Sequence, residues 1–177
     1  MSNLFIFFLL LIMDINGIKT TSTSEGDWLT LTGDNYTVEY PATWEPDQSG
    51  VMGASFILFA PLESDEDQFR ENVNLLIQDL TGMEIDLDLF TAVSEDQIKT
   101  MVDNSTLIES VRIKSDSGDY QKIIYSGEQG TFHLKYEQYY WMINEHAYIL
   151  TFTAEQDKFD AYKETGEHIL NSFSFKK

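Results

Sequence analysis

The sequence has no cysteine and few basic residues. Without a thiol, disulfide bonds, cysteine nucleophiles, cysteine-ligated zinc sites, iron–sulfur clusters and a lipid-modified N-terminal cysteine are excluded for the chain as given. Eleven lysine and arginine residues stand against thirty aspartate and glutamate residues, which gives a net charge of -19. This charge repels phosphate backbones and anionic lipid, so the sequence predicts neither nucleic-acid binding nor membrane-surface binding. A basic partner would be favoured, while the simpler interpretation is a solvated acidic surface.

No apolar run is long enough to span a bilayer as a helix, which takes about 20 residues. The continuous apolar run at residues 4–13 has a length typical of the hydrophobic region of a secretory signal. A polar stretch follows it at residues 20–26, although no lysine or arginine precedes the run. We interpret residues 1–25 as a signal-like segment with a polar linker; the alternative is a buried N-terminal element. The sequence therefore predicts an extracytoplasmic protein (periplasmic, cell-surface or secreted) without a stable membrane span in the mature chain.

The remainder, residues 26–177, is expected to form one domain. Hydrophobic residues make up 42% and aromatic residues 14% of the chain, which is enough for a folded core. Residues 36–44 are the most informative stretch: alternating apolar and polar residues predict a half-buried strand that Pro41 ends, and Trp44 then provides a large apolar anchor.

Hydrophobic periodicity predicts the other elements. Strands are expected at residues 28–31, 36–40, 54–60, 72–80, 108–114, 120–126, 131–143 and 146–153. A helical pattern is expected at residues 87–102, either as one helix or as a turn followed by a helix, and Ser94 and Gln97 resemble an internal capping box there. A second helix is expected from residue 156 onward. Loops or turns are expected at residues 33–35, 46–50, 127–130 and 144–145, and residues 173–175 either extend as a last strand or tuck under the sheet.

Several strands carry apolar residues on both faces. In residues 54–60, Phe56, Leu58 and Ala60 share one face, while Ile57 and Phe59 share the other. Such strands need cover on both sides, and the short connections between residues 108 and 153 can join only antiparallel neighbours. We therefore predict an α+β fold: an α/β/α sandwich with a central, mainly antiparallel sheet of about six to seven strands and helices on both faces.

The order of these elements resembles the PsbP-like family, which includes the PsbP subunit of photosystem II, DcrB-type bacterial envelope proteins and an import factor that binds the GTPase Ran. Three segments carry the resemblance: residues 36–44 with their strand–Pro–x–x–Trp pattern, residues 67–75, and residues 148–153 together with 169–175. The resemblance implies the fold and a binding or assembly role without catalysis. The exported bacterial members are the nearest fit, because the basic N-terminal extension of the plant subunit has no counterpart here.

Histidine and serine offer little catalytic chemistry. His133, His146 and His168 are not at metal-ligand spacing from one another, so each is interpreted as structural or surface-exposed. His168 is expected to complement a helix dipole. Ser55 begins a sequence like a hydrolase elbow, but Ile57 occupies the position of the required second glycine.

Carboxylate and aromatic clusters are the remaining candidates. Weak divalent-cation sites are considered at two acidic groups, Glu63, Asp65, Glu66 and Asp67, and Glu84, Asp86 and Asp88. A surface that stacks against sugars or a peptide is considered at Tyr136, Tyr139, Tyr140 and Trp141, against the simpler interpretation of core packing. Alternation sends Tyr136 and Tyr140 to one face of the strand, and Tyr139 and Trp141 to the other.

The sequence thus predicts an exported, non-enzymatic protein that binds an unidentified protein partner in the cell envelope. The alternatives are a carboxylate-based hydrolase and a calcium- or sugar-binding module. No residue is assigned a catalytic, cofactor-binding or metal-binding role, and no cofactor is expected.

Overall fold

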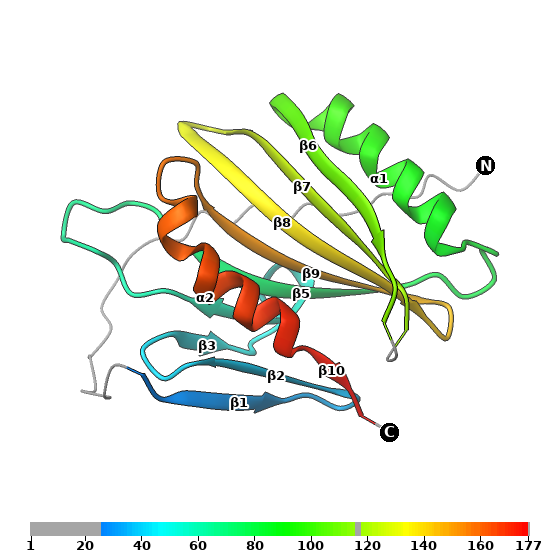
Figure 1. The fold of residues 1–177 in the computed structure, drawn as a ribbon, viewed down its shortest axis with the longest axis horizontal. Coiled ribbons are helices and arrows are strands. Elements are labelled where there is room, and N and C mark those ends of the chain that lie inside the picture. The colour runs from blue at the N-terminus through cyan, green and yellow to red at the C-terminus, as the bar shows by residue number, and fades with distance from the viewer. Residues whose placement is uncertain (1–25, 116–117, 177) are drawn as a thin grey trace.

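The computed structural model describes residues 26–115 and 118–176. The predicted signal-like segment at residues 1–25 lies outside them. The described residues form two antiparallel sheets and two α-helices (Figure 1). In order, the elements are β1 Trp28–Thr32, β2 Tyr36–Pro41, β3 Glu45–Asp47, β4 Ala54–Phe59, β5 Asn72–Asp79, α1 Leu87–Met101, β6 Asp103–Ile113, β7 Tyr120–Gln129, β8 Phe132–Ile143, β9 His146–Glu155, α2 Phe159–Ser172 and β10 Ser174–Phe175. Among these residues no helix is both long and apolar enough to cross a bilayer.

The larger sheet has seven strands in the order β3-β4-β5-β9-β8-β7-β6. Every neighbouring pair in it is antiparallel. The predicted strand number and direction are therefore confirmed. The meander from β6 to β9 depends on tight turns: at the turn after β8, Asn144 and Glu145 both have positive φ angles, 49° and 59°, as a two-residue hairpin of the right twist requires.

The predicted first hairpin forms a separate small sheet with the end of the chain. Its strand order is β1-β2-β10, and Ser174 and Phe175 pair with Thr37 and Tyr36 of β2. Of the two alternatives for residues 173–175, the terminal strand is therefore correct. The main chain of Lys176 extends this contact by donating to the carbonyl of Asn35 at 2.9 Å.

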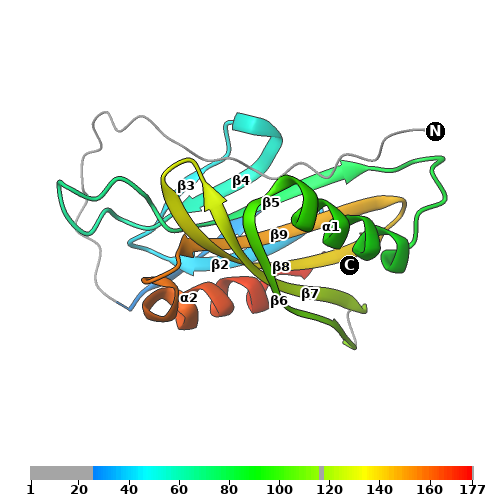
Figure 2. The same cartoon turned by 90° about the horizontal axis from the view of Figure 1, so that it is seen from above.

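Each face of the large sheet has its own hydrophobic core. Phe56, Leu58 and Ala60 lie in the core covered by α2 and the small sheet, whereas Ile57 and Phe59 lie in the core covered by α1. The two helices thus lie on opposite faces, as the two views show (Figures 1 and 2). This arrangement confirms the predicted sandwich and the predicted alternation of these strands.

Helix α2 packs very closely on the large sheet. Gly166 makes this possible, because a Cβ atom there would lie 2.7 Å from ring atoms of Phe152. The Phe152 ring in turn packs on Phe159, with 5.0 Å between the ring centroids.

The chain turns back to the core just after β2. The amide of Trp44 donates to the carbonyl of Pro41, the last residue of β2, at 2.8 Å. The Trp44 side chain is buried, as predicted.

Several predicted local features are wrong. Residues 46–50 were expected to form only a loop but include part of the short edge strand β3. Residues 127–129 of the predicted hairpin turn are strand, because Gly127 lies against Val102 and a Cβ atom there would be 2.3 Å from that side chain. Strand β6 starts five residues before the predicted 108.

Helix α1 is continuous, which decides between the two predicted alternatives. Its N-cap is Asp86, whose side chain accepts a hydrogen bond from the Leu89 amide at 2.8 Å. The predicted internal capping box is wrong, since the Ser94 hydroxyl donates to the carbonyl of Phe90 within the helix.

Candidate functional site

An aromatic-walled groove of about 570 Å³ lies where the C-terminal end of α2 meets the large sheet. This volume falls within the range of small-ligand pockets, roughly 300–1,000 Å³. We call it the aromatic groove. Its lining comes from the end of β6 and the start of β7, from β8, from the end of α2, and from β10: Ile113, Lys114, Ser115, Tyr120, Tyr139, Trp141, Leu170, Asn171, Phe173, Ser174 and Phe175.

Trp141 is at the centre of the groove wall. Its ring centroid is 5.1 Å from that of Tyr120 on one side and 5.1 Å from that of Phe173 on the other. Phe175 meets Trp141 edge-on at 6.0 Å. Tyr120 and Phe175 are only partly buried, so aromatic faces at the rim remain open to a ligand, and such faces contribute both area and preferred stacking geometry.

A buried ion pair supports the wall from behind. Glu137 is fully buried in β8, and its Oε1 is 3.0 Å from the ammonium nitrogen of Lys122. The hydroxyl of Tyr139 lies 3.2 Å from the same Oε1 and 3.3 Å from Oδ1 of Asn171 on α2. Lys122 also lies 3.8 Å from Glu167. These contacts fix the ring of Tyr139 and tie α2 to the sheet where the groove forms.

The protonation states of this cluster follow from burial and charge. Burial, together with the negative charge of Glu137, raises the pKa of Tyr139, so its hydroxyl stays protonated and can donate. Burial alone would lower the pKa of Lys122, but its hydrogen bond to Glu137 reverses this effect and the pKa is raised. Near neutral pH, Lys122 therefore remains an ammonium ion and Tyr139 a neutral hydroxyl.

A second groove of about 610 Å³ runs between the outer face of α2 and β2, and it holds an acid, a histidine and a serine. Nε2 of His168 is 3.4 Å from Oε2 of Glu39, and the His168 ring stacks on Trp28 with 3.7 Å between centroids. The Ser172 hydroxyl, however, donates to the carbonyl of Ile169 at 2.8 Å. A serine nucleophile must give its proton to a base, so this set lacks the geometry of a catalytic triad.

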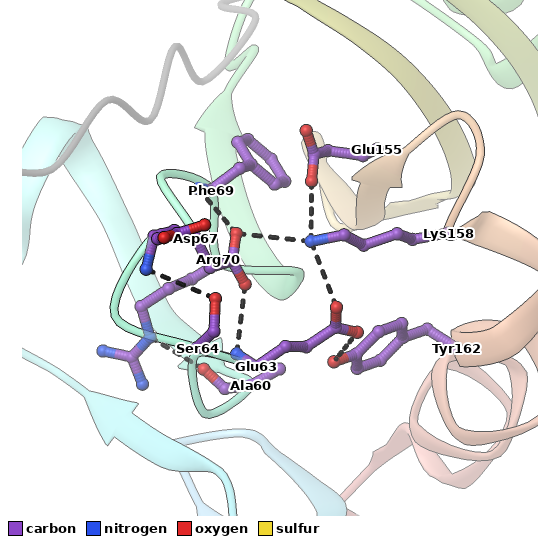
Figure 3. Close-up of polar contacts among 10 residues, drawn as sticks. Ala60, Glu63, Ser64, Asp67, Phe69, Arg70, Glu155, Lys158 and Tyr162 are labelled. Atoms are coloured by element: carbon purple, nitrogen blue, oxygen red, sulfur yellow. Dashed lines mark hydrogen bonds and ion pairs between the residues drawn. The ribbon is translucent and has the colours of Figure 1, made fainter.

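The acidic loop before β5 lies against the ammonium group of a lysine (Figure 3). The ammonium group of Lys158 lies 3.4 Å from Glu63, 3.3 Å from Asp67 and 2.8 Å from Glu155. Tyr162 of α2 donates to Glu63 at 3.0 Å. The loop is thereby fastened to the N-terminal end of α2.

Hydrogen bonds to the carboxylate of Asp67 shape this loop. Burial tends to raise the pKa of Asp67, but donation from the amides of Glu63 and Phe69 and from Lys158 holds it below its ordinary value. These contacts are drawn in Figure 3. Asp65 and Glu66, the other two predicted cation ligands, are exposed on the loop.

Glu71 is a fully buried carboxylic acid. Its side chain is 0% exposed, and neither carboxylate oxygen has a hydrogen-bond partner of ordinary geometry among the described residues. Burial raises the pKa of Glu71 to about 7, while the nearby charge of Lys158 and main-chain amides act in the opposite direction. Sequence reasoning missed this residue, because residues 67–75 were considered only for the family resemblance.

The second predicted cation group is also occupied with other contacts. Asp86 caps α1, and Asp88 forms an ion pair of 2.6 Å with Arg112 on β6. Glu84 is exposed before the helix. In the described ranges, no three histidine, cysteine, aspartate or glutamate side chains converge in a way that could hold a metal ion.

The remaining predicted residues lie far apart. His133 pairs with Glu128 at 3.3 Å in the β7–β8 hairpin, and His146 contacts the carbonyl of Asn144 at 2.7 Å. Ser55 lies within strand β4 and not on a strained turn. His168 contacts Glu39 and Trp28, two specific partners that sequence reasoning missed.

The predicted aromatic cluster divides as expected. Tyr136 and Tyr140 enter the core beneath α1, whereas Tyr139 and Trp141 enter the core beneath α2 and form the back of the aromatic groove. Sequence reasoning missed Tyr120, Phe173 and Phe175 as its other walls. Tyr120 begins a predicted strand, and Phe173 and Phe175 lie in the segment with two predicted alternatives, but only the pairing of distant strands shows that these rings meet.

Comparison with known proteins gives a consistent result. The family model described as PsbP-like protein matches residues 14–175. No curated protein matches the sequence.

Solved structures with the same fold come from several bacteria. Cyanobacterial PsbP from Synechocystis superposes with a TM-score of 0.61 at 18% identity, over 91% of this chain and 98% of that one. LpqN of Mycobacterium tuberculosis, described as involved in cell envelope biogenesis, gives 0.62 at 9% identity, over 85% and 91%. A protein of unknown function from Pseudomonas aeruginosa gives 0.56 at 11% identity, over 83% and 96%. At these identities the likeness is one of fold.

Proposed function

This chain belongs to the PsbP-like protein family, and from that membership we propose that it is an exported protein that acts by binding a protein partner and not by catalysis. The aromatic groove is the observation that carries the proposal. Its partly open rings, Tyr120 and Phe175, are of the kind that anchors a partner side chain at a protein interface.

The proposed occupant of the groove is an apolar or aromatic side chain of another protein. A rigid wall favours such an anchor, since little side-chain freedom is lost on binding. Trp141 and Tyr139 are already held by ring contacts and by the Glu137–Lys122 pair. The high negative charge of the chain speeds association with a basic partner and slows association with an acidic one.

Site-specific photo-crosslinking in the native host tests the binding role. Benzoylphenylalanine placed at Tyr120 is expected to form an adduct with one discrete protein, whereas the same residue placed at the exposed Met83, in the loop before α1, is not. A Phe175→Ala change removes one of the partly open rings of the groove wall and is expected to weaken the adduct. Equal adducts at Tyr120 and Met83, or an adduct that the Phe175→Ala change leaves undiminished, would contradict a role for the groove.

Export is tested separately by fusing residues 1–25 to alkaline phosphatase, which is active only outside the cytoplasm. The proposal requires an active fusion, and an inactive but stable fusion protein argues against export. The apolar run at residues 4–13 supports the expectation, as does the cell-envelope role stated for LpqN.

The rival class is a hydrolase that uses the Glu39–His168 pair in the second groove, a pairing of acid and base of the kind that hydrolases employ. A panel of ester, peptide and glycoside substrates decides between the classes. Turnover by the purified protein that is lost in a His168→Ala variant would establish an enzyme; the binding proposal requires no turnover.

A further inference from the structure

The large sheet ends on one side in a long edge strand, which has a neighbouring strand on one side only. Strand β6 is the last in the strand order and pairs only with β7 among the described residues (Figure 1). The opposite margin, β3, has three residues, and one of them is Pro46, which has no amide hydrogen to donate. A free margin presents a row of unpaired N–H and C=O groups, so β6 is where another strand can join this sheet.

The usable part of this margin is short and well defined. Two irregularities interrupt the pairing of β6 with β7, the second between Leu107 and Glu109. Beyond it, residues 109–113 pair one to one with residues 124–120. Because bulges disrupt a ladder and twist the strand, a further strand can continue the sheet regularly only along residues 109–113. We call these five residues the open edge.

Most of the open edge is exposed, although the side chain of Arg112 forms an ion pair with Asp88 of α1. Ile108, Glu109, Ser110 and Val111 are consecutive and all exposed, although alternate residues of a strand point to opposite faces. Ile108 is 53% and Val111 is 38% exposed. Helix α1 packs Phe90 and Ile98 into the core on one face of the sheet.

Charge and continuity identify the kind of occupant. A second copy would bring another net charge of -19 against the first, which disfavours self-association. The exposed Glu109 and Val111 share one face of β6, since they pair with Ile124 and Lys122 of β7. A complementary strand therefore carries a basic residue opposite Glu109 and an apolar residue opposite Val111. Ile113, the last residue of the open edge, also lines the aromatic groove.

We infer that the open edge binds an extended segment of another protein, with alternating basic and apolar residues, which joins the large sheet as an additional strand. This inference rests on the proposed function, since it names how the protein partner is held. Main-chain hydrogen bonds supply the affinity in this mode of recognition, and alternate side chains supply the selectivity. A strand that leaves the edge beyond Ile113 arrives at the mouth of the aromatic groove.

The test uses the full chain and a random decapeptide display library. We expect selection to enrich peptides with alternating apolar and basic residues, and fluorescence polarisation then gives their dissociation constants. A Val111→Lys change should weaken binding at least tenfold, because it places a positive charge against basic and apolar side chains. The matched control is Met52→Lys, the same change at an exposed apolar residue away from β6, and it should leave binding unchanged.

Two N-methylated forms of an enriched peptide test strand pairing on the unaltered protein. Each form has a different alternate set of amides methylated, so one should lose binding and the other keep it, because only one side of the peptide faces β6. The inference would be overturned if both methylated forms bound equally well. It would also be overturned if the Val111→Lys variant bound the enriched peptides as tightly as the unaltered protein does. A dimer in sedimentation analysis that Val111→Lys converts to monomer would overturn it too, because it would assign the edge to a second copy. If no peptide is enriched while the Tyr120 adduct forms, the edge is wrong and the binding function stands.

Discussion

The buried carboxyl group of Glu71 makes a sharp prediction about stability and pH. Its pKa is about 7 in the folded protein, against an ordinary value of 4.5. The folded state therefore favours the neutral acid, and the stability that this group contributes is present at low pH and lost as the pH rises from about 4.5 to about 7. A difference of about 2.5 between the two pKa values corresponds to ~3 kcal/mol of unfolding free energy.

A Glu71→Gln variant isolates this effect, because glutamine keeps the shape but does not ionise. The amide needs hydrogen-bond partners in a buried site and costs ~1 kcal/mol at every pH. The change with pH is therefore the informative quantity. In urea unfolding at pH 5 and pH 8, we expect the free-energy difference between variant and wild type to shift by ~2.5 kcal/mol in favour of the variant at the higher pH, because a small part of the effect is already present at pH 5.

The control for this experiment is Glu66→Gln in the acidic loop, which changes an exposed carboxylate close by in sequence. Its free-energy difference from wild type should be the same at both pH values. Asp67 does not affect this comparison. Its pKa is below the ordinary value, so its contribution to the unfolding free energy changes with pH only below about pH 4. A constant difference between Glu71→Gln and wild type from pH 5 to pH 8, or a shift of opposite sign, would refute the reasoning.

Three further changes test the packing described above. Lys122→Met leaves the buried Glu137 unpaired and should lower the unfolding free energy by ~3 kcal/mol in urea, whereas the double variant Lys122→Met/Glu137→Gln should regain most of the loss. Gly166→Ala should lower the melting temperature through a clash with Phe152, at ~1–3 kcal/mol, even though alanine favours helices; an unchanged or raised melting temperature would refute the close contact. Asp86→Ala removes the cap of α1 and should cost ~1 kcal/mol, and a neutral result would mean that the cap is replaced.

Local periodicity was enough to predict which side chains share a face. The alternation in residues 54–60 placed Phe56 and Ile57 in opposite cores, and the same rule separated Tyr140 from Trp141. This works because the two-residue repeat of a strand is a property of its own backbone. Once both faces were known to be apolar, cover by a helix on each side followed from the need to bury them.

Features that depend on distant contacts were not predictable in this way. Gly127 looked like a turn residue, whereas its actual role is to let Val102 approach the strand. The small sheet needs Thr37 and Ser174 to meet across most of the chain, and no local pattern records that pairing. The aromatic groove has the same origin: its rings come from strands, a helix and a tail that only the tertiary structure brings together.

Strand β10 has a consequence for the order in which the protein becomes active. It follows every other element of the fold in the chain, yet it closes the small sheet against β2 and supplies Phe175 to the groove wall. The groove is therefore incomplete on any nascent chain whose last strand is still inside the ribosome. If the groove binds a partner as proposed, that binding has to wait until synthesis has released β10 and this strand has paired with β2.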